Sequence, residues 1–396
     1  MVSQEMYLFG SKRSCIRELY EHGCAQAKLV GADNVFDFSL GNPSVPAPDA
    51  VGDAFLECLS ALPPIVSHGY TTAAGCLEAR AAIASSLNRR FQTNFTPKNL
   101  YLTCGAAAAL TSCFKALTVS SETEFVAIAP FFPEYRCFSA VAGAKLTVVP
   151  ADEIGFQIDF TALEKALNPH TQGVVVNSPN NPSGACFSEE TVIKLAELLH
   201  AKSAEFGHPI YLISDEPYRE IYYETTPLPF LTKYYDNTIV CYSYSKSLSL
   251  PGERIGYLLV PDETENAERV YAALAGSARS MGYVCAPSIV QQVIARCADV
   301  MPDLTVYRRN RDLLYEAFTK LNCRMAKPSG AFYLFLEAPN GDGDAFSELA
   351  KKENVLIVPG RDFGCASFVR ISYCVDTRVI ERALPILEKL VKSCRK

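Results

Sequence analysis

The amino-acid sequence predicts an α/β protein, with a large domain built on a largely parallel sheet and a smaller C-terminal domain. From about residue 70 to about residue 260, short apolar runs alternate with segments whose apolar residues recur at a helical period. The runs contain few polar residues, which is typical of parallel strands that helices cover on both faces. After about residue 290, longer helical segments surround a hairpin-like GAFYLF segment and a short VRIS run. This change of pattern separates the second domain from the first.

The individual elements follow from the same periodicities. The clearest strands are Phe125–Ala129, Leu146–Val149, Gly173–Asn177, Ile210–Ser214, Ile239–Tyr242 and Tyr257–Val260. Helices are predicted at Cys76–Arg90, Ala106–Leu117, Glu189–Ala204, Ile289–Ala298, Val306–Leu321 and Ile380–Val391. Right-handed crossovers are the expected connections between parallel strands. No internal repeat or low-complexity segment interrupts the pattern, so one enzyme-like body accounts for nearly the whole chain.

Composition narrows the classes of function. The chain has 396 residues, of which 49% are hydrophobic and 20% are charged, and its net charge is −6. Charges of both signs are interspersed, so nothing predicts nucleic-acid binding or a polybasic membrane anchor. The first ten residues lack a signal-peptide pattern, and no window of about 18 apolar residues predicts a membrane span. We therefore expect a cytoplasmic protein whose partners are small molecules.

Cysteine and histidine usage predicts neither a disulfide framework nor a metal site. The 15 cysteines are scattered without CxxC pairs, so reduced and mostly packed thiols are expected. The five histidines form no HExxH or comparable arrangement, and we expect no metal.

The most informative segment is Ser243-Tyr-Ser-Lys246, which follows the apolar run TIVCY and leads to Pro-Gly-Glu-Arg254. Open α/β sheets bind ligands in the crevice beyond the carboxyl ends of their strands. An amine, hydroxyl groups and a guanidinium group therefore converge where a phosphorylated ligand could sit. A lone lysine in a loop is usually only solvated, so the rest of such a site must come from other segments.

Other segments do place suitable groups at the ends of apolar runs. Ile213-Ser-Asp215-Glu-Pro-Tyr218 ends one run, and Asn180-Asn181-Pro-Ser-Gly184 follows another. Thr103-Cys-Gly105-Ala-Ala leads into a predicted helix, whose N-terminal amides attract phosphate. Phe131-Phe132-Pro133 adds an aromatic face that suits a flat ring. Together with Lys246, these segments gather at the strand ends, where a phosphorylated ligand could sit.

In their order and spacing, these motifs resemble those of the class I/II aminotransferases, fold-type I enzymes that use pyridoxal 5′-phosphate (PLP). The resemblance extends over almost the full length of the chain. It implies a large PLP-binding domain (residues 46–285) with a mostly parallel seven-stranded sheet, and a smaller α+β domain (residues 286–396). Residues 1–45 would form an N-terminal arm that joins the small domain. Lys246 would be the lysine that forms the Schiff base with PLP.

The resemblance also assigns the residues around the cofactor. Asp215 would face the pyridine nitrogen, while Tyr218 and Asn181 would contact the 3-oxygen of the ring. A buried carboxylate beside that nitrogen keeps it protonated, and the protonated ring then withdraws electrons from the substrate. Phe132 would stack on the ring. The phosphate would be held by Gly105, Ala106, Ala107, Ser243, Ser245 and Arg254.

Substrate recognition and assembly follow from the same resemblance. A substrate carboxylate needs a planar and always-charged partner, and Arg370 in Phe-Val-Arg-Ile-Ser is the candidate, with Asn181 beside it and Gly41 as the opposite wall. Tyr70 resembles a tyrosine that reaches the phosphate of the other subunit's cofactor, which implies a homodimer with shared sites. Arg279 lies near the segment from which dicarboxylate-specific members of the family contribute an arginine that recognises the substrate side chain in the neighbouring subunit.

The implied reaction is the transfer of an amino group between an L-amino acid and a 2-oxo acid by a ping-pong mechanism, with Lys246 moving the proton. Alanine, aromatic, branched-chain and acidic amino acids all remain candidate substrates. A PLP-dependent carbon–sulfur β-lyase shares most of these motifs and differs in releasing ammonia without a 2-oxo acid. A non-enzymatic PLP-binding regulator would carry an attached DNA-binding module, and the motifs beginning near Gly41 disfavour it.

Overall fold

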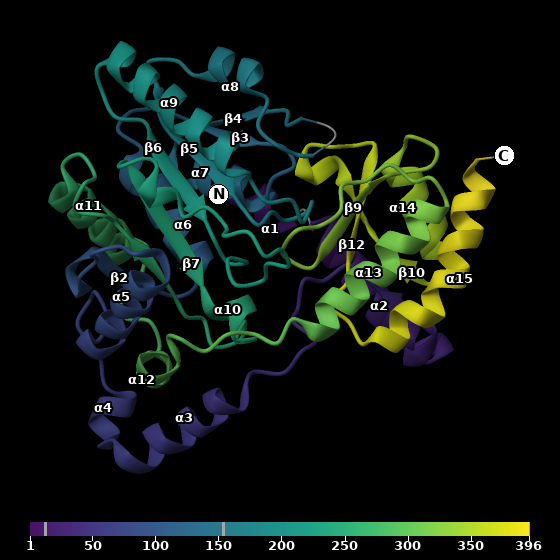
Figure 1. Cartoon of the computed structure of the whole chain (residues 1–396), viewed down its shortest axis with the longest axis horizontal. Coiled ribbons are helices and arrows are strands. Elements are labelled where there is room, and N and C mark those ends of the chain that lie inside the picture. Colours follow the sequence, from purple (N-terminus) through teal and green to yellow (C-terminus); the bar gives the residue numbers. More distant parts are fainter. Residues whose placement is uncertain (12–13, 153–154, 396) are drawn as a thin grey trace.

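A seven-stranded sheet forms the centre of the larger part of the molecule (Figure 1). The computed structural model describes residues 1–11, 14–152 and 155–395. In spatial order, the strands are β2 (Leu100–Thr103), β8 (Gly256–Leu259), β7 (Thr238–Ser243), β6 (Tyr211–Asp215), β5 (Thr171–Asn177), β3 (Glu124–Ile128) and β4 (Lys145–Val149). Strand β8 runs antiparallel to both neighbours, and the other pairs are parallel. The predicted mostly parallel seven-stranded sheet is confirmed.

Helices cover both faces of this sheet because successive strand residues point to opposite sides. Phe125 and Ala127 pack in one core with α6 (Ala106–Leu117), α7 (Glu134–Ala142) and α11 (Ala267–Ser280). Val126 and Ile128 pack on the other face with α8 (Phe160–Ala166) and α9 (Glu189–Phe206). Beside β2, β8 and β7, this second face is covered by α3 (Asp49–Ala61), α5 (Leu77–Phe91) and α12 (Ser288–Cys297). The short helices α4 (Pro64–His68) and α10 (Tyr244–Ser247) lie in connections.

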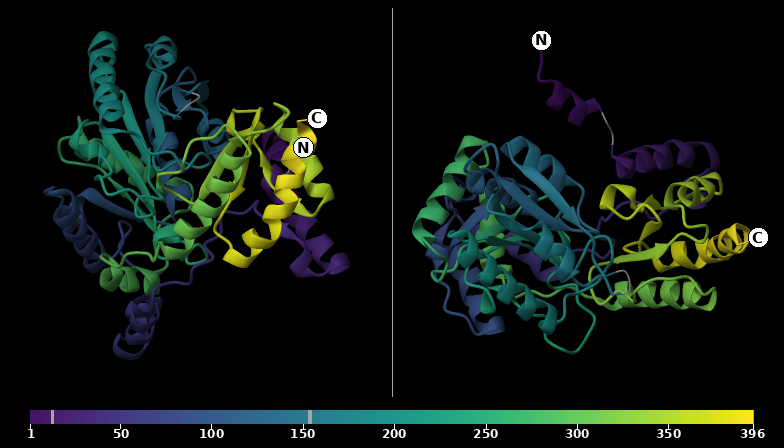
Figure 2. Two further views of the ribbon diagram at one scale, coloured as in Figure 1. Left: turned by 45° about the vertical axis from the view of Figure 1, so that its right-hand side comes forward. Right: turned by 90° about the horizontal axis from the view of Figure 1, so that it is seen from above.

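The smaller part contains two small sheets beside the large one (Figures 1 and 2). Strands β11 (Val358–Pro359), β12 (Phe368–Ser372) and β9 (Tyr333–Glu337) are antiparallel, whereas β1 (Phe36–Asp37) pairs in parallel with β10 (Val355–Leu356). Helices α13 (Thr305–Lys320), α14 (Gly343–Lys352) and α15 (Thr377–Cys394) share their core. The predicted smaller α+β unit is confirmed. The boundaries after residues 45 and 285 stay a proposal, since α12 packs with α3 and α5.

Two N-terminal helices precede the first strand, and the sequence patterns did not predict them. In α2 (Cys15–Val30), Cys15 and Leu19 pack against residues of the small sheets. Helix α1 (Gln4–Ser11) buries no residue and projects away from the rest of the chain in Figure 2. Four single 3-10 turns complete the list of elements: Ala32–Asn34, Pro97–Asn99, Leu231–Lys233 and Gly360–Phe363.

The described residues contain no candidate membrane span and no cluster of metal ligands. None of the helices in this part of the chain is long and apolar enough to cross a membrane. Across residues 1–11, 14–152 and 155–395, no three or more His, Cys, Asp or Glu side chains group as metal ligands would. All 15 cysteines lie within the described residues, and none of them forms a disulfide.

Candidate active site

A cavity of about 300 Å³ lies where the carboxyl ends of β5, β6 and β7 approach the small antiparallel sheet. Asp215 is the last residue of β6, Ser243 is the last residue of β7, and Lys246 lies on α10. Arg370 reaches the same cavity from β12. Of the residues predicted from the sequence, the cavity lining includes Gly41, Ala106, Ala107, Phe132, Asn181, Asp215, Tyr218, Ser243, Ser245, Lys246, Arg254 and Arg370.

The amine of Lys246 is held in the cavity by one hydrogen bond. Helix α10 begins after Ser243, whose hydroxyl accepts from the amide of Ser245 at 3.2 Å. The Lys246 Nζ donates to the carbonyl of Gly41 at 2.6 Å. Burial lowers the pKa of Lys246 to about 8, and the positive charge of Arg370 acts in the same direction. A substantial fraction of this amine is therefore neutral, and able to act as a nucleophile or base, near pH 8.

The carboxylate of Asp215 is buried and only partly satisfied. Its Oδ2 accepts a hydrogen bond of 2.6 Å from the hydroxyl of Tyr135, while its Oδ1 has no partner among the described residues. Burial raises the pKa of Asp215 to about 7, and the Tyr135 hydroxyl opposes that rise. An unpaired buried acceptor costs about 1–3 kcal/mol. A ligand that donates to Oδ1 would remove this cost.

Asn177 connects two of the predicted residues, and its role was not predicted. Its side-chain amide donates to the backbone carbonyl of Asp215 at 2.8 Å, and its Oδ1 accepts from the amide of Asn181 at 2.7 Å. The loop after β5 is thereby fixed relative to the end of β6. The only sequence signal was its place at the end of a predicted strand.

Tyr333 of β9 is a second residue that the sequence analysis missed. Its hydroxyl lies 2.8 Å from the hydroxyl of Tyr218, and burial raises the pKa of Tyr333 to about 12. A Cβ atom on Gly41 would lie 2.0 Å from the Tyr333 hydroxyl oxygen, so any larger residue there would force the Tyr333 side chain to move. The hairpin-like segment around Tyr333 was predicted, but nothing in it indicated which residue would face the cavity.

Arg370 is a buried cation without an ion-pair partner among the described residues. Only 2% of this residue is exposed, and its guanidinium group lies 4.6 Å from the ring centre of Tyr333 and 5.1 Å from that of Phe363. It donates to Asn181 Oδ1 at 2.9 Å and to the carbonyl of Ser39, whereas its Nε has no partner in the part of the chain described. Buried charges are normally paired, so an anionic ligand suits this position.

The end of the cavity beside α6 has the features of a phosphate site. Ala106 and Ala107 lie in the first turn of α6, where backbone amides are free to bind an anion. The hydroxyls of Ser243 and Ser245 are 2.8 Å apart at the same cavity. Gly105 does not line the cavity itself, but its φ is +85° and a Cβ atom there would lie 3.3 Å from Arg254 Nη2. Glycine thus allows the arginine to approach the helix start.

Besides Gly105, two predicted residues lie outside this cavity in the single chain. The side chain of Tyr70 is 98% exposed, and Arg279 is exposed in the last turn of α11. Neither lines the cavity. Their predicted roles require a second chain.

Comparisons with known proteins agree on one family. Residues 33–387 match the sequence model for "Aminotransferase class I and II". The "Aspartate/prephenate aminotransferase" of Thermus thermophilus is 30% identical over 353 residues, which cover 87% of this chain and 88% of that protein. A crystal structure of an amino transferase from Eubacterium rectale is 55% identical, with a TM-score of 0.97 over 100% of both chains. The aspartate aminotransferase of T. thermophilus with maleate has a TM-score of 0.85 and 26% identity, covering 98% of this chain and 99% of that one.

Proposed function

Because this chain belongs to the class I and II aminotransferases, we propose that it transfers amino groups with PLP held covalently by Lys246. The observation that carries this proposal is the unpartnered Oδ1 of Asp215, buried in the cavity that also contains the Lys246 amine. A ring nitrogen that carries a proton would supply the missing donor.

The remaining residues of the cavity also fit PLP. Phe132 offers an aromatic face for the ring, and the first turn of α6 offers backbone amides for the phosphate. The hydroxyls of Ser243 and Ser245 and the guanidinium group of Arg254 complete the phosphate site. When bound, PLP supplies a protonated ring that withdraws electrons from the Cα atom of an amino acid.

The protein's own groups account for binding and proton movement. Arg370 and Asn181 would bind the substrate carboxylate and fix the direction of the Cα–H bond. Lys246 has a pKa of about 8, so its neutral amine would take the proton from the Cα atom of the substrate. The resulting ammonium group would then be the proton donor of the following step. Burial raises the pKa of Tyr218 well above its usual range, so its hydroxyl remains a donor throughout. The Lys246 amine is therefore available as a base near pH 8, where the Tyr218 hydroxyl still carries its proton.

We further propose that the enzyme is a homodimer with shared sites. Tyr70 is exposed in one chain and follows α4, where Ile65 is 78% exposed. Leu56 and Leu59 of the neighbouring α3 are also exposed, so this region presents apolar surface that a second copy would bury. In such a dimer, Tyr70 would reach the partner's phosphate site, and Arg279 would approach the partner's substrate.

The covalent attachment can be tested directly. Protein loaded with PLP is reduced with borohydride, digested and analysed by mass spectrometry, with Lys246→Ala as the control. The label should appear on the peptide that contains Lys246 and be absent from the variant. A label on any other lysine in the wild-type protein would reject the assignment.

The reaction is tested with a panel of amino acids, with and without a 2-oxo acid. We expect one stoichiometric amino-group transfer to the cofactor without an acceptor, continued turnover when a 2-oxo acid is present, and no release of ammonia. Catalytic ammonia release without a 2-oxo acid would instead identify a β-lyase. The amino acid that reacts fastest defines the substrate class.

The shared site is tested by mixing two inactive variants, Lys246→Ala and Tyr70→Phe. In a mixed dimer, the subunit that retains Lys246 receives Tyr70 from its partner, so one of its two sites is intact. Activity should therefore rise on mixing, to about half that of the wild-type dimer at most. No gain in activity, in a sample shown to contain mixed dimers, would place Tyr70 outside the partner's site.

A further inference from the structure

Four charged side chains form a cluster behind the cavity, between the loop after β6 and helix α5. Glu216, Arg219 and Glu220 are buried, and the side chain of Arg90 on α5 is 27% exposed. Arg219 Nε donates to Glu216, while Arg90 Nη2 lies 2.9 Å from Glu220 Oε1. The two carboxylates and two guanidinium groups balance one another.

A directed chain of hydrogen bonds leads from this cluster to α10. The hydroxyl of Tyr242 lies 2.6 Å from Glu220 Oε2 and 2.8 Å from the hydroxyl of Ser247. A phenol carries a single proton, and the carboxylate can only accept, so Tyr242 donates to Glu220. Ser247 must then donate to Tyr242. The guanidinium group of Arg219 lies 4.5 Å from the centre of the Tyr242 ring and holds that ring in place.

The chain joins the two loops that carry the candidate catalytic residues. Glu220 is two residues after Tyr218, and Ser247 directly follows Lys246. Tyr242 directly precedes Ser243 on β7, so its side chain points to the opposite face of the sheet. Ser243 therefore faces the cavity, whereas Tyr242 and its hydrogen bonds lie on the opposite face of the sheet.

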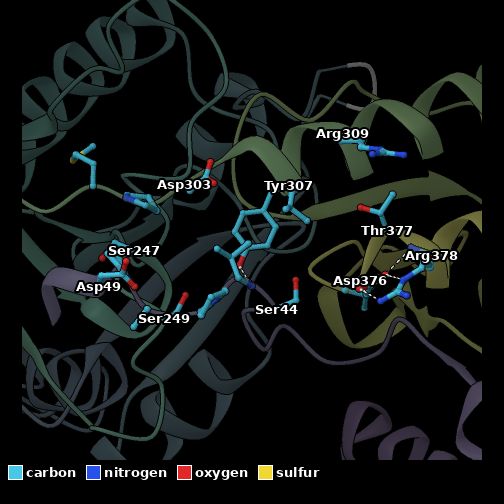
Figure 3. A pocket seen from close by; sticks show the side chains of 18 of the residues that line it. Ser44, Asp49, Ser247, Ser249, Asp303, Tyr307, Arg309, Asp376, Thr377 and Arg378 are labelled. Carbon is cyan, nitrogen blue, oxygen red and sulfur yellow. Dashed lines mark hydrogen bonds and ion pairs between the residues drawn. The ribbon is translucent and has the colours of Figure 1, made fainter. Parts of the chain in front are cut away.

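The surroundings of Ser247 make this bond a specific restraint. Lys246 and Ser247 line two different cavities that share no lining residue. The second cavity has a volume of about 720 Å³, and Figure 3 shows Ser247 and Ser249 there opposite Tyr307. Ser247 itself is only 2% exposed, and Leu248, the next residue, is fully buried in the core with α5 and α12, so the end of α10 is also held by packing. The bond from Ser247 to Tyr242 adds to this packing a restraint that has a direction.

Stability alone does not explain such a cluster, because apolar residues of similar volume often stabilise a protein as much as a buried ion pair does. We propose that Glu220, Tyr242 and Ser247 form a positioning chain that holds α10 so that the Lys246 amine meets its substrate. This inference rests on the proposed function. The three residues act through Lys246 and touch neither substrate nor cofactor.

The first test replaces Tyr242 by Phe in the PLP-loaded enzyme. We expect kcat to fall by about 10- to 100-fold, the range of a hydrogen bond to a charged group. The KM for the amino acid should stay within about 2-fold, because Arg370 is not altered. Tyr244→Phe is the matched control: this buried ring lies 5.0 Å from Tyr242, and its hydroxyl forms no hydrogen bond among the residues described. The control should retain wild-type kcat.

A second pair of variants, at Ser247, tests the same hydrogen bond if Tyr242→Phe does not fold. Ser247→Ala removes the donor and should lower kcat in the same way, whereas Ser247→Thr keeps the hydroxyl and should restore it. Loss of activity in both variants alike would contradict the role of the hydrogen bond.

A third measurement does not depend on turnover. In the ligand-free protein, the pH dependence of Lys246 acylation is followed by mass spectrometry. Loosening α10 exposes the amine, so the midpoint in Tyr242→Phe should move upward from about 8 by about one pH unit. The charged and titratable groups that act on Lys246, namely Arg370, Arg254 and Cys374, are unchanged in this variant.

The outcomes separate this inference from the proposed function. A lower melting temperature with unchanged kcat and an unchanged midpoint would make the chain purely structural and overturn the inference. A wild-type protein that moves no amino group would count against the proposed function. In that case, a shifted midpoint in Tyr242→Phe would still support the positioning of Lys246.

Discussion

The hydroxyl of Tyr135 donates a 2.6 Å hydrogen bond to Oδ2 of Asp215, and Oδ1 of the same carboxylate is left without a partner among the described residues. Two opposing effects therefore set the charge of Asp215. Burial raises its pKa to about 7, and the phenol acts against that rise. Near neutral pH the group is divided between its two forms, and a cationic ligand would shift it to the carboxylate.

Replacing Tyr135 by Phe removes the donor that stabilises the ionised form of Asp215. We expect the affinity for PLP and kcat each to fall by about 10-fold or more at pH 7–8, since hydrogen bonds to charged groups contribute about 1.5–3 kcal/mol. Equilibrium titration with PLP and steady-state kinetics measure the two effects. Tyr101→Phe is the control, because the buried Tyr101 hydroxyl has no partner within the described ranges. Equal effects of both variants would refute a specific role of Tyr135.

The pKa of Asp215 also predicts how the stability of the ligand-free protein depends on pH. Its value rises from 3.8 to about 7 on folding, so between these values the folded state binds more protons than the unfolded state. The contribution of Asp215 to stability is therefore fully present below about pH 4 and decreases as the pH rises to about 7. Urea unfolding at pH 5 and pH 8, compared with Asp215→Asn, measures it. Wild-type stability relative to the variant should be lower at pH 8, and a constant difference would contradict the prediction.

Arg370→Lys keeps the charge but removes the planar pair of donors. We expect the KM for the amino acid to rise by about 10- to 100-fold, with a smaller change in kcat, because a lysine cannot bind a carboxylate at two points. Steady-state kinetics with the best amino acid of the panel measure this effect. Arg361→Lys, at a side chain that is 57% exposed, should leave both constants unchanged. An unchanged KM in Arg370→Lys would remove Arg370 from substrate binding.

Gly41→Ala would place a Cβ atom 2.0 Å from the Tyr333 hydroxyl oxygen and 3.0 Å from its Cζ atom. We expect a loss of about 1–3 kcal/mol in the free energy of unfolding, as is typical of overpacking. Removing the oxygen with Tyr333→Phe should relieve part of this clash. The double variant should then lose less stability than the two single variants together, as measured by chemical denaturation. Additivity within about 0.5 kcal/mol would contradict the contact.

The sequence predicted the parts of the site that lie at strand ends. Lys246 and Asp215 follow apolar runs, and the motif around Arg370 forms a strand of its own. These positions were predictable because a parallel sheet brings its carboxyl ends to one edge.

The partners of these residues could not be predicted in the same way. Tyr135 lies 80 residues from Asp215, and Tyr333 lies 115 residues from Tyr218. Their contacts depend on how α7 and β9 pack, which no local pattern specifies. Helix α2 escaped prediction because its buried positions form only a narrow stripe at Cys15, Leu19 and Gly23. The roles of Tyr70 and Arg279 depend on a second chain.

The pairing of β1 with β10 has a consequence for synthesis of the protein. Phe36 and Val355 are partners in this two-stranded sheet although about 320 residues separate them. Nearly the whole chain must therefore be translated before the partner strand of Phe36 leaves the ribosome. The large sheet, whose strands all lie within residues 100–259, can form first. The Gly41 carbonyl that accepts from the Lys246 amine lies only a few residues after β1. The site is therefore completed late, when β10 near the end of the chain pairs with β1 near its start.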